Sequence, residues 1–223
     1  NNITPSSVVA SPEVIKGSSP PPPPPQVIWL SGGCGSGKST TASMIKQQQC
    51  HPTAIVIKVS KLLRRHAEEN PHTKAGQVIV ETITSGAIED HFDITLRLVL
   101  HEIDRKLKEA AVNQQRDAQL VIIDGMPRTA LQATKLMELG GGSKVFSIVY
   151  FDCPDEERIK RLSERAREGE DWKQRVETDS VEREKFNALS VAHPECMFMI
   201  SSLIPKEERL KQLLSFIEEH QQH

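Results

Sequence analysis

The sequence is poor in cysteine, in aromatic residues and in excess charge of either sign. Its 223 residues include four cysteines, and aromatic residues make up 4% of the chain. The cysteines lie far apart without a C-x-x-C pair, so they offer neither the spacing of a zinc site nor a secreted disulfide framework. A reducing, cytoplasmic compartment is therefore the expected location.

Excess positive charge and long apolar runs are missing as well. The formal net charge is -2, whereas a general nucleic-acid binder needs an excess of Lys and Arg to neutralise phosphates. No apolar run approaches the roughly 18 residues that a membrane-spanning helix requires, and no charged-then-apolar leader opens the chain. We therefore expect small-molecule partners rather than nucleic acid or a membrane, and a monomeric chain.

Proline is concentrated in one place. Residues 1–25 are rich in Ser, Pro and Val and end in six consecutive prolines, Pro20 to Pro25. Because proline fixes φ and cannot donate a backbone hydrogen bond, this run predicts an extended polyproline II segment. The segment is interpreted as a stiff, disordered linker or, alternatively, as a ligand for SH3, WW or similar aromatic grooves.

The remaining chain, residues 26–223, alternates between short β-branched runs and longer amphipathic segments. Because strands that alternate with helices build parallel sheets covered on both faces, the pattern predicts an α/β fold with three α/β/α layers and about five parallel strands. The predicted strands are residues 27–30, 54–59, 120–124, 145–151 and 196–201. The predicted helices include residues 41–49, 76–85, 90–111, 129–139 and 206–220, with further helices after Ser60 and Pro154.

One glycine-rich stretch carries the clearest chemistry. Residues Gly32 to Thr40 read G-G-C-G-S-G-K-S-T and fit the phosphate-loop pattern G-x-x-x-x-G-K-[ST], between a predicted strand and a predicted helix. The glycines let backbone N–H groups surround phosphate oxygens, the lysine reaches the terminal phosphates, and the hydroxyl ligates Mg²⁺. The sequence therefore predicts a site for a nucleoside triphosphate with Mg²⁺.

Four stretches, taken in order, resemble the adenylate kinases and other nucleoside-monophosphate kinases over about residues 26–220. They are Gly32 to Thr40, Ser60-Lys61-Leu62-Leu63-Arg64, Ile123-Asp124-Gly125-Met126-Pro127-Arg128, and Phe151-Asp152-Cys153-Pro154 with the arginine-rich helix after it. The resemblance implies Mg²⁺-dependent phosphoryl transfer from ATP to a nucleoside monophosphate. It also implies an acceptor-binding helical arm at about residues 60–87 and a short lid at about residues 166–184, which close over the substrates.

The resemblance assigns the donor side to the phosphate loop and to Asp124. The implied ATP-binding residues are Gly33, Cys34, Gly35, Ser36, Gly37, Lys38, Ser39 and Thr40. Lys38 is implied to cradle the ATP phosphates and Ser39 to approach Mg²⁺, while Asp124 orients the metal through water. Because Asp124 precedes a glycine, a purely turn-forming aspartate is the alternative.

The resemblance also assigns an acceptor side. The implied AMP-binding residues are Arg64, Ile88, Gly125, Arg128 and Gln132. Permanently charged, planar guanidinium groups suit the acceptor's phosphate, and Gln132 matches the base-reading glutamine of adenylate kinases, where pyrimidine kinases tend to carry Asn. The expected reaction is ATP + AMP giving two ADP, with a UMP or CMP kinase as the alternative. For Gln132 itself, a solvated helix-surface position is the alternative.

Two further arginines are implied to act in catalysis beside Lys38 and Arg128. Arg161 and Arg165 lie four residues apart, hence on one helical face, and match arginines at the foot of the family's lid. Glu157 lies four residues before Arg161, so a helix-surface ion pair accounts for part of this pattern.

The predicted lid departs from the family pattern. Ten of the seventeen residues from 167 to 183 are charged, which predicts a solvated excursion, and Glu170 stands where a phosphate-clamping arginine is expected. Arg167, Arg175 and Arg183 are the candidates to replace it. A catalytically weak, nucleotide-binding module of a longer chain therefore stays an alternative to an active enzyme.

Cys34 stands where the family often has proline. Backbone N–H groups and a helix N-terminus stabilise a thiolate, so we expect a depressed pKa for the Cys34 thiol. A thiol of that kind would be readily oxidised and would block the ATP site.

Overall fold

The computed structural model describes residues 24–47, 53–85, 91–112, 120–140, 146–165 and 172–221. Most of the predicted N-terminal proline segment, residues 1–23, lies outside these ranges. Among the described residues, none of the helices combines the length and the apolar composition that crossing a membrane requires.

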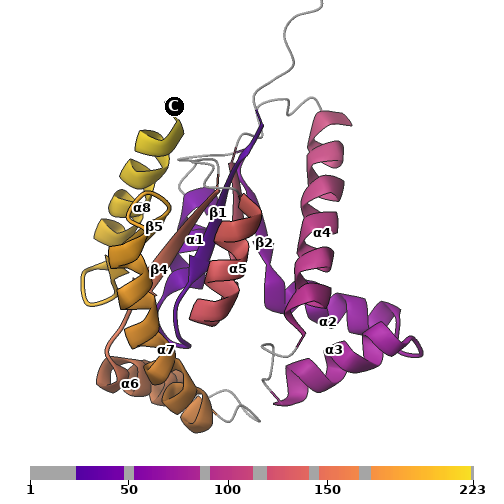
Figure 1. Ribbon diagram of the computed structural model, residues 1–223, viewed down its shortest axis with the longest axis horizontal. Coiled ribbons are helices and arrows are strands. Elements are labelled where there is room, and N and C mark those ends of the chain that lie inside the picture. Colours follow the sequence, from indigo (N-terminus) through magenta and orange to yellow (C-terminus); the bar gives the residue numbers. More distant parts are fainter. Residues whose placement is uncertain are drawn as a thin grey trace, which may run out of the picture.

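Five parallel strands form one sheet in the order β2-β3-β1-β4-β5 (Figure 1). They are β1 (Gln26–Ser31), β2 (Ile55–Lys58), β3 (Leu120–Asp124), β4 (Phe146–Asp152) and β5 (Met197–Ser201). The central strand β1 pairs with β3 and β4, so that Trp29 lies beside Ile123 and Ile148. The predicted parallel α/β sheet is therefore confirmed, and β2 is one of its two edge strands.

Eight helices of the described residues surround this sheet. They are α1 (Lys38–Gln47), α2 (Val59–Glu69), α3 (Lys74–Ser85), α4 (Phe92–Val112), α5 (Ala130–Gly140), α6 (Asp155–Arg165), α7 (Trp172–Ala192) and α8 (Lys206–Gln221). Figure 1 shows α2 and α3 together at one end of the molecule, and α6 with the start of α7 at the other.

Alternating side chains of the strands divide the core into two layers. On β1, Trp29 packs into a cluster with residues of α2, α4, α5 and α7, whereas Ile28 and Leu30 pack into a cluster with α1 and α8. The same alternation runs through β3, where Ile123 and Ile122 belong to opposite layers. Both faces of the sheet are apolar because helices cover both, as a parallel sheet requires.

The boundary between β2 and α2 differs from the prediction. The apolar run predicted a strand through Val59 and a helix capped by Ser60, but α2 begins at Val59 and its N-cap position, Lys58, forms no side-chain capping bond. Val59 is 1% exposed. Burial of this side chain at the start of the helix outweighs the β preference of a branched residue.

The expected solvated excursion at residues 167–183 is wrong for the part that the structure describes. Residues 172–183 are the first half of the 21-residue helix α7, in which Val176, Glu182 and Phe186 are buried. Lys173 and Glu177 are exposed, whereas Asp179 and Arg183 are half-buried and contact other elements, so only part of the charge of this stretch faces solvent. Opening and closing of a lid at residues 166–184, and of the arm at residues 60–87, stays a prediction.

Candidate functional site

The phosphate loop joins β1 to α1 in the conformation that its glycines allow. Gly35 and Gly37 have φ values of 80° and 87°, a region that residues with a Cβ rarely adopt. At the end of the loop, the N–H groups of Thr40 and Thr41 both donate to the Gly37 carbonyl at 3.1 Å. The loop therefore passes directly into the first turn of a helix, whose N-terminal end favours bound anions.

Lys38 folds back over this loop. Its Nζ donates to the carbonyls of Gly32 at 2.7 Å and Gly33 at 3.1 Å. Burial lowers the pKa of the Lys38 ammonium, and the nearby carboxylate of Asp124 opposes that shift. The ammonium group is thus held at the mouth of the loop by backbone oxygens that a phosphate can replace.

A hydroxyl and a carboxylate meet where the predicted metal site lies. Ser39 Oγ donates to Asp124 Oδ1 at 2.9 Å, although 85 residues separate the two. Asp124 ends β3 and is 5% exposed. Because its side chain contacts the phosphate loop, Asp124 does more than form a turn.

The carboxylate of Asp179, on α7, also contacts the phosphate loop. Asp179 Oδ2 accepts a hydrogen bond from the Cys34 N–H at 2.8 Å and another from Arg158 Nη1 at 2.9 Å. Arg158 is 2% exposed and also pairs with Asp155 at 2.8 Å. Gly33 leaves the space for this guanidinium, since a Cβ there would lie 1.9 Å from Arg158 Nη1. A carboxylate of the chain itself therefore occupies one backbone N–H of the phosphate loop.

The expected depressed pKa of Cys34 is wrong. Burial first, and then the charge and the hydrogen bond of Asp179, raise the pKa of its thiol to about 11, against smaller opposing effects of Arg158 and Lys38. The thiol is therefore neutral near pH 7, which removes the basis for an oxidation-sensitive site.

A small hollow connects the phosphate loop to the turn that follows β3. About 70 Å³ in volume, it is lined by Gly32, Cys34, Lys38, Gly125, Pro127, Arg128 and Asp179. Two contacts hold its walls together, because Gly125 N–H donates to the Leu30 carbonyl at 3.2 Å and Ser31 Oγ donates to the Pro127 carbonyl at 2.6 Å. The structure thus brings predicted donor residues and the predicted acceptor residue Arg128 to one cavity.

Gln132 lies at the start of α5, directly behind this turn. Its side-chain oxygen accepts a hydrogen bond from the Arg128 N–H at 2.8 Å, and the residue is 3% exposed. The alternative of a solvated surface glutamine is therefore wrong.

Of three other predicted residues, one is described away from the hollow, and the structure does not describe the side chains of the other two. Arg64 is exposed on α2 and does not line it. Ile88 lies outside the described residues, and of Arg165 the structure describes only the backbone, as the last residue of α6.

Arg161 and Arg183 are both engaged by groups of the chain. Arg161 donates to the carbonyls of Gly35 at 3.3 Å and Ser202 at 2.8 Å, and it forms the expected ion pair with Glu157 at 2.8 Å. Arg183 pairs with Asp152 at the end of β4. Of the other two candidate replacements for the lid arginine, Arg167 lies outside the described residues and the Arg175 side chain is not described.

Sequence reasoning missed Arg158 and Asp179, and it also missed Arg209. Arg209, on α8, donates to the Ser36 carbonyl at 3.2 Å and is 7% exposed. Arg158 lies three residues after Asp155, so the pair between them could have been expected from helical spacing. Nothing in the local sequence indicated Asp179, whose partner Cys34 is 145 residues away.

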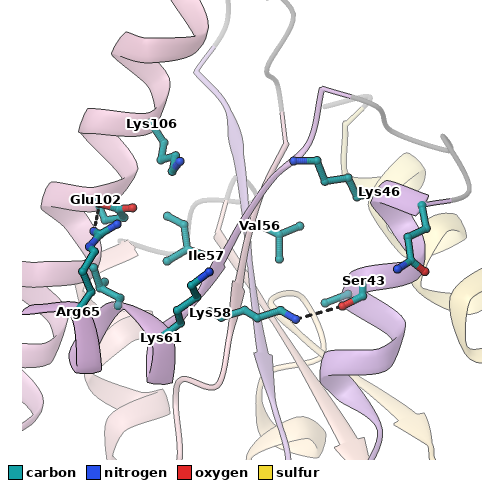
Figure 2. A pocket seen from close by; sticks show the side chains of 12 residues that line it. Ser43, Lys46, Val56, Ile57, Lys58, Lys61, Arg65, Glu102 and Lys106 are labelled. Atoms are coloured by element: carbon teal, nitrogen blue, oxygen red, sulfur yellow. Dashed lines mark hydrogen bonds and ion pairs between the residues drawn. The ribbon is translucent and has the colours of Figure 1, made fainter.

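A second, larger hollow lies along the free edge of β2. We call it the β2-edge groove; it has a volume of about 600 Å³, and the cations that line it are Lys46, Lys58, Lys61, Arg65 and Lys106. Figure 2 shows these side chains around β2, with Val56 and Ile57 on opposite sides of the strand. Since both faces of β2 contribute, the groove follows the edge of the strand rather than one face of the sheet.

Comparisons with known proteins agree with this geometry. A family model described as an AAA domain matches residues 31–178. The chain is 32% identical over 131 residues to the adenylate kinase of Treponema denticola, across 59% of this chain and 54% of that protein. It is 31% identical over 140 residues to the adenylate kinase of Mycobacteroides abscessus, across 62% of this chain and 69% of that protein.

The relatives also include kinases named for pyrimidine nucleotides. A UMP-CMP kinase of Prunus armeniaca is 29% identical over 139 residues, across 62% of this chain and 53% of that protein. The chain spans about half the length of the first curated relatives it matches. A solved structure of the deoxyadenosine kinase of M.mycoides, with dCMP and dCDP bound, superposes with a TM-score of 0.46 at 14% identity, covering 86% of this chain and 99% of that one.

Proposed function

Because this chain is an AAA-domain P-loop protein and belongs to the nucleoside-monophosphate kinases, we propose that it transfers the terminal phosphoryl group of ATP to AMP, giving two ADP. The observation that carries the proposal is the hollow that Lys38 and Arg128 share. A cation of the phosphate loop and a guanidinium of the β3 turn face one space, as two phosphorylated substrates would require.

For phosphoryl transfer, the protein mainly has to bring two polyanionic substrates together, align them and exclude water. Two carbonyl oxygens of the loop hold the Lys38 ammonium beside the hollow, and the ATP phosphates would replace these oxygens as its partners. The Arg128 guanidinium would hold the phosphate of the acceptor, which suits a planar group with several parallel donors. Arg64, on the predicted arm, would add a second contact when the arm closes.

The residues at the end of β3 fit a magnesium ion. Mg²⁺ prefers hard oxygen ligands and commonly takes only one or two from a kinase, with the rest from water and substrate phosphates. Ser39 and Asp124 supply such oxygens, and the described residues hold no cluster of three or more His, Cys, Asp or Glu side chains that would make a separate metal site. When bound with ATP, the metal would neutralise phosphate charge.

AMP is favoured as the acceptor by Gln132. This residue matches the base-reading glutamine of adenylate kinases, and its buried side chain is fixed by its bond to the Arg128 N–H. The alternative acceptor is UMP or CMP, which the names of several relatives suggest.

A coupled assay of the full chain with ATP and Mg²⁺ tests both the proposed site and the proposed acceptor. AMP, CMP and UMP are offered in turn to the wild type and to the Lys38→Ala and Arg128→Ala variants. We expect ADP formation with AMP and a loss of roughly a hundredfold or more in each variant, since each removes a charge that acts on transferring phosphate.

The matched controls are Lys211→Ala and Arg97→Ala, which remove exposed cations of α8 and α4. These variants should keep wild-type turnover. Equal turnover in all five proteins would disprove the proposed site, while faster turnover with UMP or CMP than with AMP would reverse the proposed acceptor. ATP binding without ADP production would support the binding-module alternative.

A further inference from the structure

The phosphate loop holds an anion of the chain at the place where it should hold an anion of the ligand. Asp179 Oδ2 lies 2.8 Å from the Cys34 nitrogen and 2.9 Å from Arg158 Nη1, and Asp179 lines the same hollow as Lys38. Backbone N–H groups of a glycine-rich loop and a guanidinium are the donors that proteins use to bind phosphate oxygens. A carboxylate oxygen is an acceptor of the same charge and similar size.

Asp179 and a triphosphate cannot both use these donors. The Cys34 N–H is aimed at Oδ2, so a phosphate oxygen bound to the same N–H would occupy the position of that carboxylate oxygen. A carboxylate and a phosphate brought to the same donors would also repel each other as like charges. Nucleotide binding therefore requires Asp179 to leave.

We propose that Asp179 holds the place of a phosphate oxygen in the nucleotide-free protein, and that ATP takes over its two donors, the Cys34 N–H and the Arg158 guanidinium. This inference rests on the proposed ATP site and adds a phosphate-binding residue, Arg158, to it. The guanidinium supplies a positive contact in a chain whose predicted lid has Glu170 where the family pattern has arginine.

The surroundings of both side chains suit such an exchange. The Asp179 side chain is 26% exposed, so its carboxylate can be hydrated when it withdraws. Arg158 keeps its pair with Asp155 at 2.8 Å and its bond to the Val176 carbonyl at 2.9 Å, so the guanidinium stays in place after Asp179 has gone. The hydrogen-bond donors therefore stay in place, while the carboxylate that accepts their bonds can be replaced by a phosphate oxygen.

ATP affinity of an isosteric variant tests the exchange. Asp179→Asn keeps the volume of the side chain but removes its charge, and ATP binding is measured by calorimetry with Mg²⁺ on the full chain. If the carboxylate fills the site about nine-tenths of the time, its removal raises the apparent affinity for ATP roughly tenfold. The control is Glu177→Gln, which removes an exposed carboxylate of the same helix and should leave the affinity unchanged.

A second substitution tests the role of Arg158 as a phosphate ligand. In the Asp179→Asn background, Arg158→Gln should lower ATP affinity roughly tenfold, because the guanidinium no longer has Asp179 as a partner and its loss acts on the nucleotide. Asp179→Ala serves as the second variant if the Asn variant fails to fold, and thermal unfolding of each protein reports on folding. Equal ATP affinity with and without Arg158 in this background would overturn its assignment.

Lys38→Ala separates failure of this inference from failure of the proposed function. If Lys38→Ala binds ATP as tightly as the wild type does, the ATP site itself is wrong. If ATP binding depends on Lys38 but Asp179→Asn and Asp179→Ala bind ATP no more tightly than the wild type, the site stands and the exchange is overturned.

Discussion

The phosphate loop and the β2-edge groove both contain several cationic side chains, but the two regions differ in how firmly these side chains are held. Around the loop, Lys38 is bonded to two carbonyl oxygens and Arg158 to two carboxylates. Around the groove, Lys58 donates to Ser43 Oγ at 3.3 Å, and Lys46 and Lys61 form no ion pair with any described residue. Arg65 and Lys106 of the groove pair with Glu102 at 2.8 Å and Glu109 at 3.6 Å. The cations near the loop are held in position, whereas the three lysines Lys46, Lys58 and Lys61 of the groove are exposed to solvent.

The difference shows why a count of positive charges does not locate the site. The groove is the larger hollow and has more lysines, but long exposed side chains lose entropy when they are ordered and contribute little through screened charge. The loop offers fewer cations, which are desolvated and preorganised, and such groups act far more strongly on a phosphate. The contrast predicts that removing one charge has unequal consequences in the two regions.

Arg158→Met should produce the largest loss of stability. The variant keeps apolar volume but removes a buried guanidinium and its bonds to Asp155 and Asp179. Because both carboxylates reach water and can be hydrated again, we expect a loss of about 2 kcal/mol in the free energy of unfolding rather than the full cost of two buried charges. Urea denaturation at pH 7 measures it. A loss below about 0.5 kcal/mol, the range of ordinary surface substitutions, would show that the loop region is not organised around Arg158.

Glu102→Gln tests how much the charge of Glu102, the one carboxylate among the residues that line the groove, contributes to stability. Hydrogen bonds from Arg105, and then from Arg65, lower the pKa of the Glu102 carboxyl from 4.5 to about 2. A lowered pKa in the folded state contributes stability above pH 4.5, and that contribution is lost as the pH falls toward 2. We expect the variant to be about 1 kcal/mol less stable than the wild type at pH 7, and the difference to shrink between pH 4.5 and pH 2.

The control for Glu102 is Glu69→Gln. Glu69 is exposed and lies 4.0 Å from Arg65, so its replacement should change stability little at any pH. A Glu102→Gln deficit that is the same at pH 7 and at pH 2.5 would contradict the assignment, since it would reflect packing rather than charge.

Lys61→Gln should have the smallest effect, of the opposite sign. Lys61 forms no ion pair with a described residue and shares the groove with Lys46 and Lys58, so its removal relieves repulsion between like charges. We expect a gain of a few tenths of a kcal/mol at low salt. The gain should disappear in 0.5 M salt, because the screening length then falls to a few ångströms, on the order of a contact distance. A loss of stability would mean that Lys61 is held by its surroundings, as Lys38 is at the loop.

Much of the fold followed from the sequence because its signals are local. The apolar run at residues 120–124 coincides with β3, and the alternation of strands and helices predicted the parallel sheet. The phosphate loop was also local, since one stretch contains the glycines, the lysine and the hydroxyl, between a strand and a helix. Its pairing of Ser39 with Asp124 could be expected because parallel strands end at the same edge of the sheet.

Only the tertiary structure decided how α7 meets the loop. A highly charged stretch predicted solvent exposure, and no periodic pattern marked Asp179 as the residue that would turn inward to Cys34 and Arg158. The same packing raised the pKa of the Cys34 thiol, which the loop alone would have lowered. Sequence by itself determined which groups could bind phosphate, because backbone donors and their spacing are local. Packing determined which anion they hold, because that choice depends on a contact between Cys34 and Asp179, which are 145 residues apart along the chain.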